Sequence, residues 1–286
     1  MGKVPVITLK NGVEMPQLGL GMMNETTQEE MDAAVSAALE AGYTSFDTAY
    51  VYGNEKELGH SLNKYAKDRK DLFITNKSRM LRHSYQDTID TVYRQLESLQ
   101  TNYFDLYLIH WPLPVKPQLY IEAWHALEKL YKDGIIRALG VSNFFVKHLK
   151  RLMEECEVEP MVNQIQGHPY YVNHEVVAFC KEHNIQMESW QPFGAGVLLS
   201  DETICGIGRE HGKSAAQIIL RWQMQKGFAA IPGPIEPEFI KENIEIFDFE
   251  LSDEEMERID AMECQKPIML DVCKGVYDPD EFPLMW

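Results

Sequence analysis

The sequence has few cysteines, and nothing in their arrangement suggests a disulfide framework or a metal site. The five cysteines are an odd number, are widely spread and include no Cys-x-x-Cys pair. No histidine stands at a spacing from them that is typical of zinc ligands. We therefore predict free thiols in a reducing compartment and no bound metal.

The chain also lacks long apolar segments and an excess of positive charge. No apolar run approaches the ~20 residues of a membrane span, and the N-terminus lacks the apolar core of a signal peptide. The formal net charge is −17, which disfavours nucleic acid and anionic lipid as partners. We predict a cytoplasmic protein with a small-molecule ligand. No unpaired apolar stripe demands a second chain, so a monomer or a weak homo-oligomer is expected.

What the chain does contain is an unbroken alternation of strand and helix patterns. Asn11-Gly12, a dipeptide that favours a two-residue hairpin turn, separates residues 6–9 from residues 13–15 and predicts an N-terminal hairpin. Strands are then expected at residues 17–21, 44–47, 72–76, 104–110, 135–141, 162–166, 185–190 and 228–231. Eight strands, each followed by a helix, close most readily as a parallel barrel.

The predicted fold class is therefore α/β, a (β/α)8 TIM barrel with an N-terminal β-hairpin and two extra helices. The extra helices are expected at residues 202–210 and from the Ser252–Glu255 capping box to Met262. The 286 residues suit one such domain, typically ~250 residues with insertions. Residues from about 263 to 286 have no periodicity and are expected to form a tail over the barrel mouth.

Four polar residues follow predicted strands, at the end of the barrel where reactive groups stand in this fold. Asp47 and Tyr52 follow the second strand. Lys77 follows the third, and His110 follows the fourth. A tyrosine with a pKa of ~10 is a poor acid at neutral pH, but an adjacent ammonium lowers that pKa and an aspartate holds the ammonium in place. A histidine can then orient a carbonyl, so the set suits proton transfer coupled to hydride transfer.

Each of these residues also has an ordinary explanation. A lysine at a strand end is usually solvated, Asp47 is acceptable as a turn residue, and His110 is acceptable in a core. Their common position at one rim of one barrel favours the catalytic interpretation.

Several motifs resemble the signatures of the aldo-keto reductase superfamily. They are Phe46-Asp47-Thr48-Ala49, Tyr52-Gly53-Asn54-Glu55, Leu108-Ile109-His110-Trp111-Pro112, Gly140-Val141-Ser142-Asn143-Phe144, Asn163-Gln164-Ile165 with His168-Pro169-Tyr170, and Ile240-Lys241-Glu242-Asn243. The match runs in order from about residue 7 to residue 259. The resemblance implies an oxidoreductase that reduces an aldehyde or ketone with NAD(P)H and uses Tyr52 as the general acid. Lys77 and Asp47 would tune the tyrosine, and His110 would orient the carbonyl.

The resemblance also implies how the cofactor is held. Ser142, Asn143 and Gln164 are expected to hydrogen-bond the nicotinamide carboxamide, and Trp190 is expected to stack on the nicotinamide ring. Residues 192–196 would fold over the pyrophosphate. The other cofactor-binding positions that the resemblance implies are Gln191, Phe193, Gly194, Gly233, Glu242 and Asn243.

The sequence departs from the family where the 2′-phosphate of NADP is bound. Many relatives have Ile-Pro-Lys-Ser and then an arginine, but this chain has Gly233-Pro234 and Phe239 at those places. Charge-assisted hydrogen bonds contribute about 1.5–3 kcal/mol each, so we predict that NAD(H) is used at least as well as NADP(H). Rescue of phosphate binding by Lys213 or Lys241 is the alternative.

The predicted substrate pocket departs from the family as well. Met23, Trp111 and Phe144 are the expected substrate contacts, and Met22-Met23 replaces a common aromatic residue with a softer wall. Aromatic residues of the tail are also placed to close the pocket. Two other functions fit the same scaffold: a binding protein that senses the nucleotide, and an epimerase that uses the nicotinamide for transient oxidation.

Overall fold

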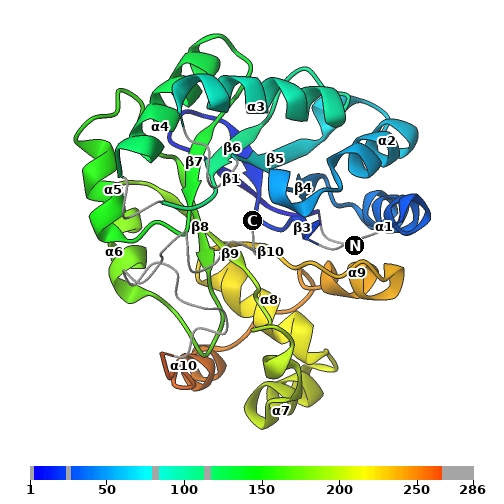
Figure 1. The fold of residues 1–286 in the computed structure, drawn as a ribbon. Coiled ribbons are helices and arrows are strands. Elements are labelled where there is room, and N and C mark those ends of the chain that lie inside the picture. Colours follow the sequence, from blue (N-terminus) through cyan, green and yellow to red (C-terminus); the bar gives the residue numbers. More distant parts are fainter. Residues whose placement is uncertain (1–2, 24–26, 79–83, 113–116, 266–286) are drawn as a thin grey trace, which may run out of the picture.

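The computed structural model describes residues 3–23, 27–78, 84–112 and 117–265. Its central feature is a ring of parallel strands, seen around the middle of Figure 1. The strands are β3 (Leu20–Gly21), β4 (Ser45–Asp47), β5 (Phe73–Lys77), β6 (Leu106–Ile109), β7 (Leu139–Ser142), β8 (Val162–Gln166), β9 (Gln186–Trp190) and β10 (Ala229–Ile231). Each pairs with its neighbour in chain order, and a parallel bridge from Leu18 to Ala230 closes the ring. The predicted eight-stranded parallel barrel is confirmed.

Helices surround the strands (Figure 1). They are α1 (Gln28–Ala41), α2 (Glu55–Tyr65), α3 (Tyr85–Ser98), α4 (Pro117–Lys132), α5 (Val146–Met153), α6 (His174–Glu182), α7 (Glu202–His211), α8 (Ala215–Gln225), α9 (Pro237–Asn243) and α10 (Asp253–Asp260). The helices α7 and α10 are the two predicted extra ones. Short 3-10 turns lie at η1 (Tyr50–Tyr52), η2 (Arg69–Asp71) and η3 (Val197–Ser200). No helix in the described ranges is long and apolar enough to cross a membrane.

Local sequence signals explain where the helices begin and end. A capping box starts α1: the Thr27 side chain accepts from the backbone of Glu30, and the Glu30 side chain accepts from the backbone of Thr27. The helix ends at Gly42, whose φ of 105° is accessible to glycine at little cost. The predicted capping box between Ser252 and Glu255 starts α10.

The N-terminal hairpin consists of β1 (Val6–Thr8) and β2 (Glu14–Pro16), which pair antiparallel. Its loop is longer than the predicted two residues. The backbone N–H of Leu9 donates to Val13, which leaves three residues, 10–12, in the loop. Gly12 takes the left-handed φ of 87° that such three-residue loops require. The prediction of a two-residue turn was wrong because Leu9 pairs with Val13, so that Lys10 joins Asn11 and Gly12 in the loop.

The hairpin covers the end of the barrel where the strands begin. Leu9 and Met15 are buried in a cluster with residues near the starts of several strands. The barrel members of that cluster are Phe73, Leu106, Leu108, Ala138, Met161, Val162 and Ala229. The hairpin therefore seals one end, and the chemistry must be sought at the other.

Candidate active site

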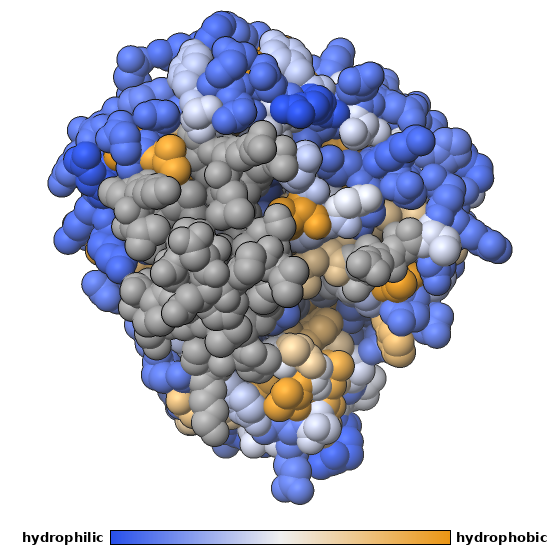
Figure 2. Space-filling model, viewed as in Figure 1, coloured by the Kyte–Doolittle hydropathy of each residue, from blue (hydrophilic) through white to orange (hydrophobic). Residues whose placement is uncertain are grey.

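A cavity of about 790 Å³ opens at the end of the barrel where the strands finish. Its volume lies within the ~300–1,000 Å³ typical of small-molecule sites. Figure 2, viewed as Figure 1, shows apolar residues gathered around a hollow on a face that is otherwise mainly hydrophilic. Exposed apolar side chains at this cavity include Met23, Leu199 and Phe239.

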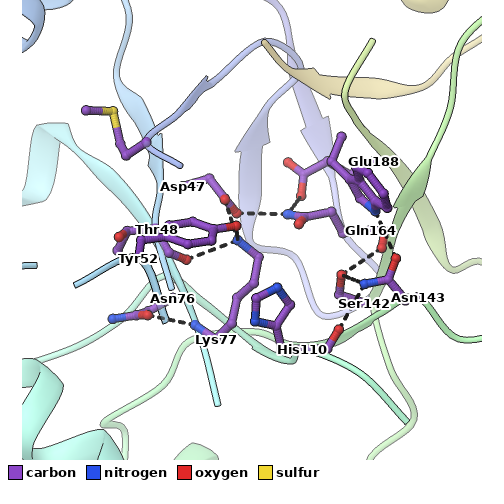
Figure 3. A network of polar contacts seen from close by, with 12 residues as sticks. Asp47, Thr48, Tyr52, Asn76, Lys77, His110, Ser142, Asn143, Gln164 and Glu188 are labelled. Carbon is purple, nitrogen blue, oxygen red and sulfur yellow. Dashed lines mark hydrogen bonds and ion pairs between the residues drawn. The ribbon is translucent and has the colours of Figure 1, made fainter. Parts of the chain in front are cut away.

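A buried ammonium stands beside the cavity. Lys77, the last residue of β5, is 0% exposed, and its Nζ donates to Asp47 at the end of β4. The same Nζ donates to the carbonyl oxygen of Thr48 at 3.0 Å and lies 3.5 Å from the hydroxyl oxygen of Tyr52. Figure 3 shows the ammonium between the carboxylate and the phenol. The ends of β4 and β5 and the turn η1 after β4 therefore bring a carboxylate, an ammonium and a phenol into one cluster.

Burial and charge act against each other in this cluster. Burial lowers the pKa of Lys77, but the negative charge of Asp47 and the contact with Tyr52 outweigh it, so the pKa is raised and the ammonium is kept. Burial raises the pKa of Asp47 against the opposing effect of Lys77. Burial also raises the pKa of Tyr52, which Lys77 opposes without cancelling. The expected net lowering of the Tyr52 pKa was therefore wrong, because desolvation outweighs the ammonium.

His110 completes the group that the sequence singled out. It follows β6 and lines the cavity together with Asp47 and Tyr52. Its ring centroid is 6.1 Å from that of Tyr52, and the two rings are nearly perpendicular at 85°. Its carbonyl oxygen accepts a hydrogen bond from the Asn143 side chain at 3.0 Å, which ties the end of β6 to the end of β7. A carbonyl group in the cavity can therefore approach the imidazole and the phenol together.

A network of polar side chains joins the ends of β7, β8 and β9. The Ser142 hydroxyl donates to the backbone carbonyl oxygen of Gln164 at 2.9 Å, and the Trp190 indole N–H donates to Asn143 Oδ1 at 2.9 Å. Asn143 adopts a left-handed φ of 62°, a conformation that asparagine tolerates better than most residues. Ser142, Asn143, Gln164 and Trp190 all line the cavity, so the structure brings together the residues expected at the nicotinamide.

Glu188 is a member of the site that the sequence analysis missed. It lies on β9, is 2% exposed, and accepts a hydrogen bond from Gln164 Nε2 at 2.7 Å. The same Nε2 donates to Asp47 Oδ2 at 2.8 Å, so Gln164 bridges two carboxyl groups (Figure 3). Burial, followed by the charge of Asp47, raises the pKa of Glu188 to about 7. The only signal in the sequence was a charged residue within a barrel strand, two positions before Trp190.

The far part of the cavity is formed by the loop after β9 and by the helices that follow. Gln191 and Phe193 line it, as do Glu242 and Asn243 at the end of α9, whereas Gly194 is not among the lining residues. The first residues of α8 line it as well. They include Ser214, the N-cap residue whose side chain accepts from the backbone of Gln217. A helix N-terminus at this place favours an anionic ligand, as a pyrophosphate would be.

The positions of the altered phosphate site also lie at the cavity. Gly233, Pro234 and Phe239 line it, and Phe239 is 49% exposed. Among the described residues, no lysine or arginine lines the cavity. Lys213 donates to both carboxylate oxygens of Asp248 at 2.8 Å. Lys241 donates to Glu40 at 3.2 Å. Both lysines are therefore held by other partners.

The three expected substrate residues are not all brought to the cavity. Met23 and Trp111 line it, and Met23 is 52% exposed. Phe144 is 0% exposed and packs against Tyr120, with the ring centroids 5.3 Å apart, and is not among the lining residues. The left-handed turn at Asn143 precedes it. The aromatic residues of the tail lie outside the described residues.

The arrangement suits proton transfer at an oxygen that lies next to Tyr52 and His110. The nicotinamide dinucleotide implied by the sequence fits the cavity chemically, because polar groups lie at its inner end and a helix N-terminus lies at its outer end. When bound, such a group supplies or accepts a hydride. Within the described ranges, no group of three or more histidine, cysteine, aspartate or glutamate side chains is placed to hold a metal ion.

Comparison with known proteins supports this interpretation of the site. A model of the Aldo/keto reductase family matches residues 17–263. The chain is 46% identical over 256 residues to glyoxal reductase of Bacillus subtilis, covering 90% of this chain and 92% of that protein. It is 42% identical over 265 residues to methylglyoxal reductase DkgA of Yersinia pestis, covering 92% and 94%. A mutant of Gox0644 solved in complex with NADPH is 36% identical, with a TM-score of 0.90 and coverage of 96% of this chain and 100% of that chain.

Proposed function

Because this chain belongs to the aldo/keto reductase family, we propose that Tyr52 is the general acid that protonates a carbonyl oxygen in its cavity. The protein is an NAD(P)H-dependent oxidoreductase that reduces an aldehyde or ketone to an alcohol. A bound nicotinamide would supply the hydride, and Tyr52 would supply the proton that completes the hydroxyl. The observation that carries this assignment is the buried Lys77 ammonium between Asp47 and the Tyr52 hydroxyl.

Each residue of the cluster then has a defined task. Tyr52 is protonated at neutral pH, since burial raises its pKa, and it becomes an anion when it gives up its proton. The Lys77 ammonium stabilises that anion, and Asp47 keeps the ammonium charged and in place. His110 orients the carbonyl by a hydrogen bond to its oxygen. A binding protein or an epimerase on the same scaffold is not favoured, since the relatives with known activities are reductases.

The proposed substrates are small compounds with two adjacent carbonyl groups. The support comes from the relatives, which are named glyoxal reductase and methylglyoxal reductase. A second carbonyl withdraws electrons from the first and makes its carbon a better hydride acceptor. Trp111 and Met23 line the same cavity as His110, and such a compound would lie against them.

The proposed nucleotide is NAD(H), used at least as well as NADP(H). The support is the absence of lysine and arginine from the described lining of the cavity and the engagement of Lys213 and Lys241 elsewhere. Glu242 lines the cavity together with Gly233, Pro234 and Phe239, the positions of the altered phosphate site. A carboxylate accepts hydrogen bonds from a ribose 2′-hydroxyl but repels a 2′-phosphate, which is how other dinucleotide-binding proteins favour NAD.

Two measurements test these proposals. The first is kcat/KM for NADH and for NADPH with glyoxal and methylglyoxal. A preference for NADPH above about a hundredfold, which is the work of one or two charge-assisted hydrogen bonds, would refute the nucleotide proposal. The second is the variant Tyr52→Phe. Loss of the general acid should lower kcat by about 10²–10⁴-fold while leaving the Kd of NADH unchanged. An unaffected kcat would remove Tyr52 from its role.

A further inference from the structure

The buried carboxyl group of Glu188 has no task in the mechanism above. It lies inside the barrel on β9, where an acid costs free energy unless a partner compensates it. Its hydrogen-bond donor is Gln164 on the adjacent strand β8, at 2.7 Å from Glu188 Oε2. The backbone register pairs these same two residues. Both the hydrogen bond and the strand register therefore pair Glu188 with Gln164 at the cavity wall.

Both N–H groups of that side chain are occupied by carboxyl groups. Gln164 Nε2 donates to Glu188 on one side and to Asp47 on the other, at 2.8 Å. A primary amide has two N–H donors and one carbonyl acceptor. Gln164 lines the cavity, so the only part of its amide left for a ligand is the carbonyl oxygen. If the Gln164 side-chain amide were flipped, its oxygen would face the oxygens of two carboxyl groups, and the two sets of oxygens would repel each other.

We propose that Glu188 is a positioning residue, which acts with Asp47 to fix the Gln164 amide so that it offers a hydrogen-bond acceptor to the nicotinamide carboxamide. This inference rests on the proposed function. A carboxamide has a donor end and an acceptor end, and an acceptor at Gln164 binds only the donor end. Glu188 thereby selects one orientation of the nicotinamide and so the ring face that meets the carbonyl.

The same carboxyl group also sets the charge of the site. The groups that face it are Gln164 from β8, Asp47 from β4 and Lys77 from β5, whereas the paired residues of β10 are apolar. Burial and the charge of Asp47 bring the pKa of Glu188 to about 7. Ionised Glu188 adds a second negative charge near the single ammonium and makes the Tyr52 anion less favourable. Carbonyl reduction should therefore slow as the pH rises through about 7.

Nucleotide binding tests the positioning role without turnover. The variant Glu188→Ala should bind NADH about fivefold more weakly than the wild type, as expected for a misoriented hydrogen bond. It should bind ADP-ribose, which has no nicotinamide, as the wild type does. Tryptophan fluorescence or calorimetry measures both. Equal losses for the two ligands, or no loss for either, would overturn the proposal. Glu128→Gln, a change of a buried acid outside the cavity, is the control.

The variant Glu188→Gln separates the hydrogen bond from the charge. Its amide oxygen still accepts from Gln164, so NADH affinity should stay within twofold of the wild type, while the titration is lost. The decline of kcat between about pH 6 and 8 should disappear. An unchanged pH profile would overturn the charge part of the inference. A wild type without reductase turnover would refute the proposed function instead, and the ADP-ribose comparison would still decide the role of Glu188.

Discussion

Two buried clusters of charge lie at opposite ends of the same barrel and differ in their supply of cations. At the cavity end, Lys77 is the one ammonium among Asp47, Glu188 and Tyr52. At the hairpin end, the single carboxylate of Asp105, just before β6, has two cationic partners. Both clusters hold a carboxylate that is 2% exposed or less. Burial alone therefore does not distinguish the cluster that is proposed to take part in the reaction from the cluster that stabilises the fold.

The Asp105 cluster is rich in partners. Its carboxylate accepts from Arg69 and from Arg137, each at 2.7 Å, and from the backbone N–H of Ile74 at 2.9 Å. The arginine side chains are 21% and 48% exposed, so water solvates the part of their charge that Asp105 does not meet. Three donors therefore satisfy the oxygens of this carboxylate. The cluster connects η2 to β6 and holds the fold together at this end.

The cavity cluster has few cations, and its acidic groups Tyr52 and Glu188 therefore hold protons that they can transfer. One ammonium is shared by three groups that become negative when they ionise, so not all of them can do so together. The raised pKa values of Tyr52 and Glu188 follow from that shortage as well as from burial. The ratio of cations to acids, more than the depth of burial, therefore marks the end of the barrel that is suited to proton transfer.

The largest effect is expected from removing the acid that holds the ammonium. Asp47→Asn should lower kcat by about 100-fold or more, because Lys77 is then less firmly placed to stabilise the Tyr52 anion. Steady-state kinetics with saturating NADH and glyoxal measure this effect, and ADP-ribose binding serves as the control for an intact fold. A kcat within threefold of the wild type would contradict the proposed role of the cluster.

The same substitution, aspartate to asparagine, at the hairpin end of the barrel should lower the free energy of unfolding and leave kcat unchanged. Asp105→Asn should lower the free energy of unfolding by about 3 kcal/mol, because two arginines lose their buried carboxylate. Urea unfolding measures the loss. At a temperature where the variant is folded, its kcat should match the wild type. A fall in kcat comparable to that of Asp47→Asn would erase the distinction between the two ends.

The shortage of cations should also appear in the pH dependence of stability. The pKa of Glu188 is about 7 in the folded protein and near 4.5 as an ordinary glutamate. Between these values the folded state holds a proton that the unfolded state has released, so stability falls as the pH rises and is level above about 7. Glu188→Gln should therefore be about 3 kcal/mol more stable than the wild type at pH 8, and equally stable below pH 4.5. Urea titrations at the two pH values decide it.

Adding a cation to the cavity end is expected to have a smaller effect. Phe239→Arg places a guanidinium beside the outer part of the cavity and should raise kcat/KM for NADPH about tenfold, through a charge-assisted contact with the 2′-phosphate. The value for NADH should change little. The matched control is Lys241→Ala, which should leave both values within twofold because Lys241 already binds Glu40. A loss of NADPH activity in the control would show that Lys241 reaches the phosphate.

Much of the architecture followed from local signals. The alternation of strands and helices predicted the barrel, and the capping box at Ser252 predicted where α10 begins. The placement of Asp47, Tyr52, Lys77 and His110 at one rim followed from parallel strands ending on the same side. The hairpin loop is one residue longer than predicted, since the pairing of Leu9 with Val13 is a property of the folded sheet.

The features that sequence could not supply depend on contacts between distant positions. Gln164 meets Asp47 across 117 residues of chain, and its second hydrogen bond, to Glu188 on the next strand, brings that acid into the site. The direction of the Tyr52 pKa depends on how much desolvation the folded surroundings impose, which no spacing encodes. Phe144 belongs to a motif at a strand end, but its ring packs in the core against Tyr120.

The hairpin of residues 6–16 closes the base of the barrel with Leu9 and Met15. A chain shortened to begin at Gln17 would keep the residues described at the cavity, but it would expose the apolar base of the barrel to water. Its molecules would aggregate through that surface, so the yield of refolded protein would fall while the kcat of the folded fraction stayed unchanged. The short hairpin takes no part in the reaction, but it covers the apolar base of the barrel and so limits aggregation of the enzyme.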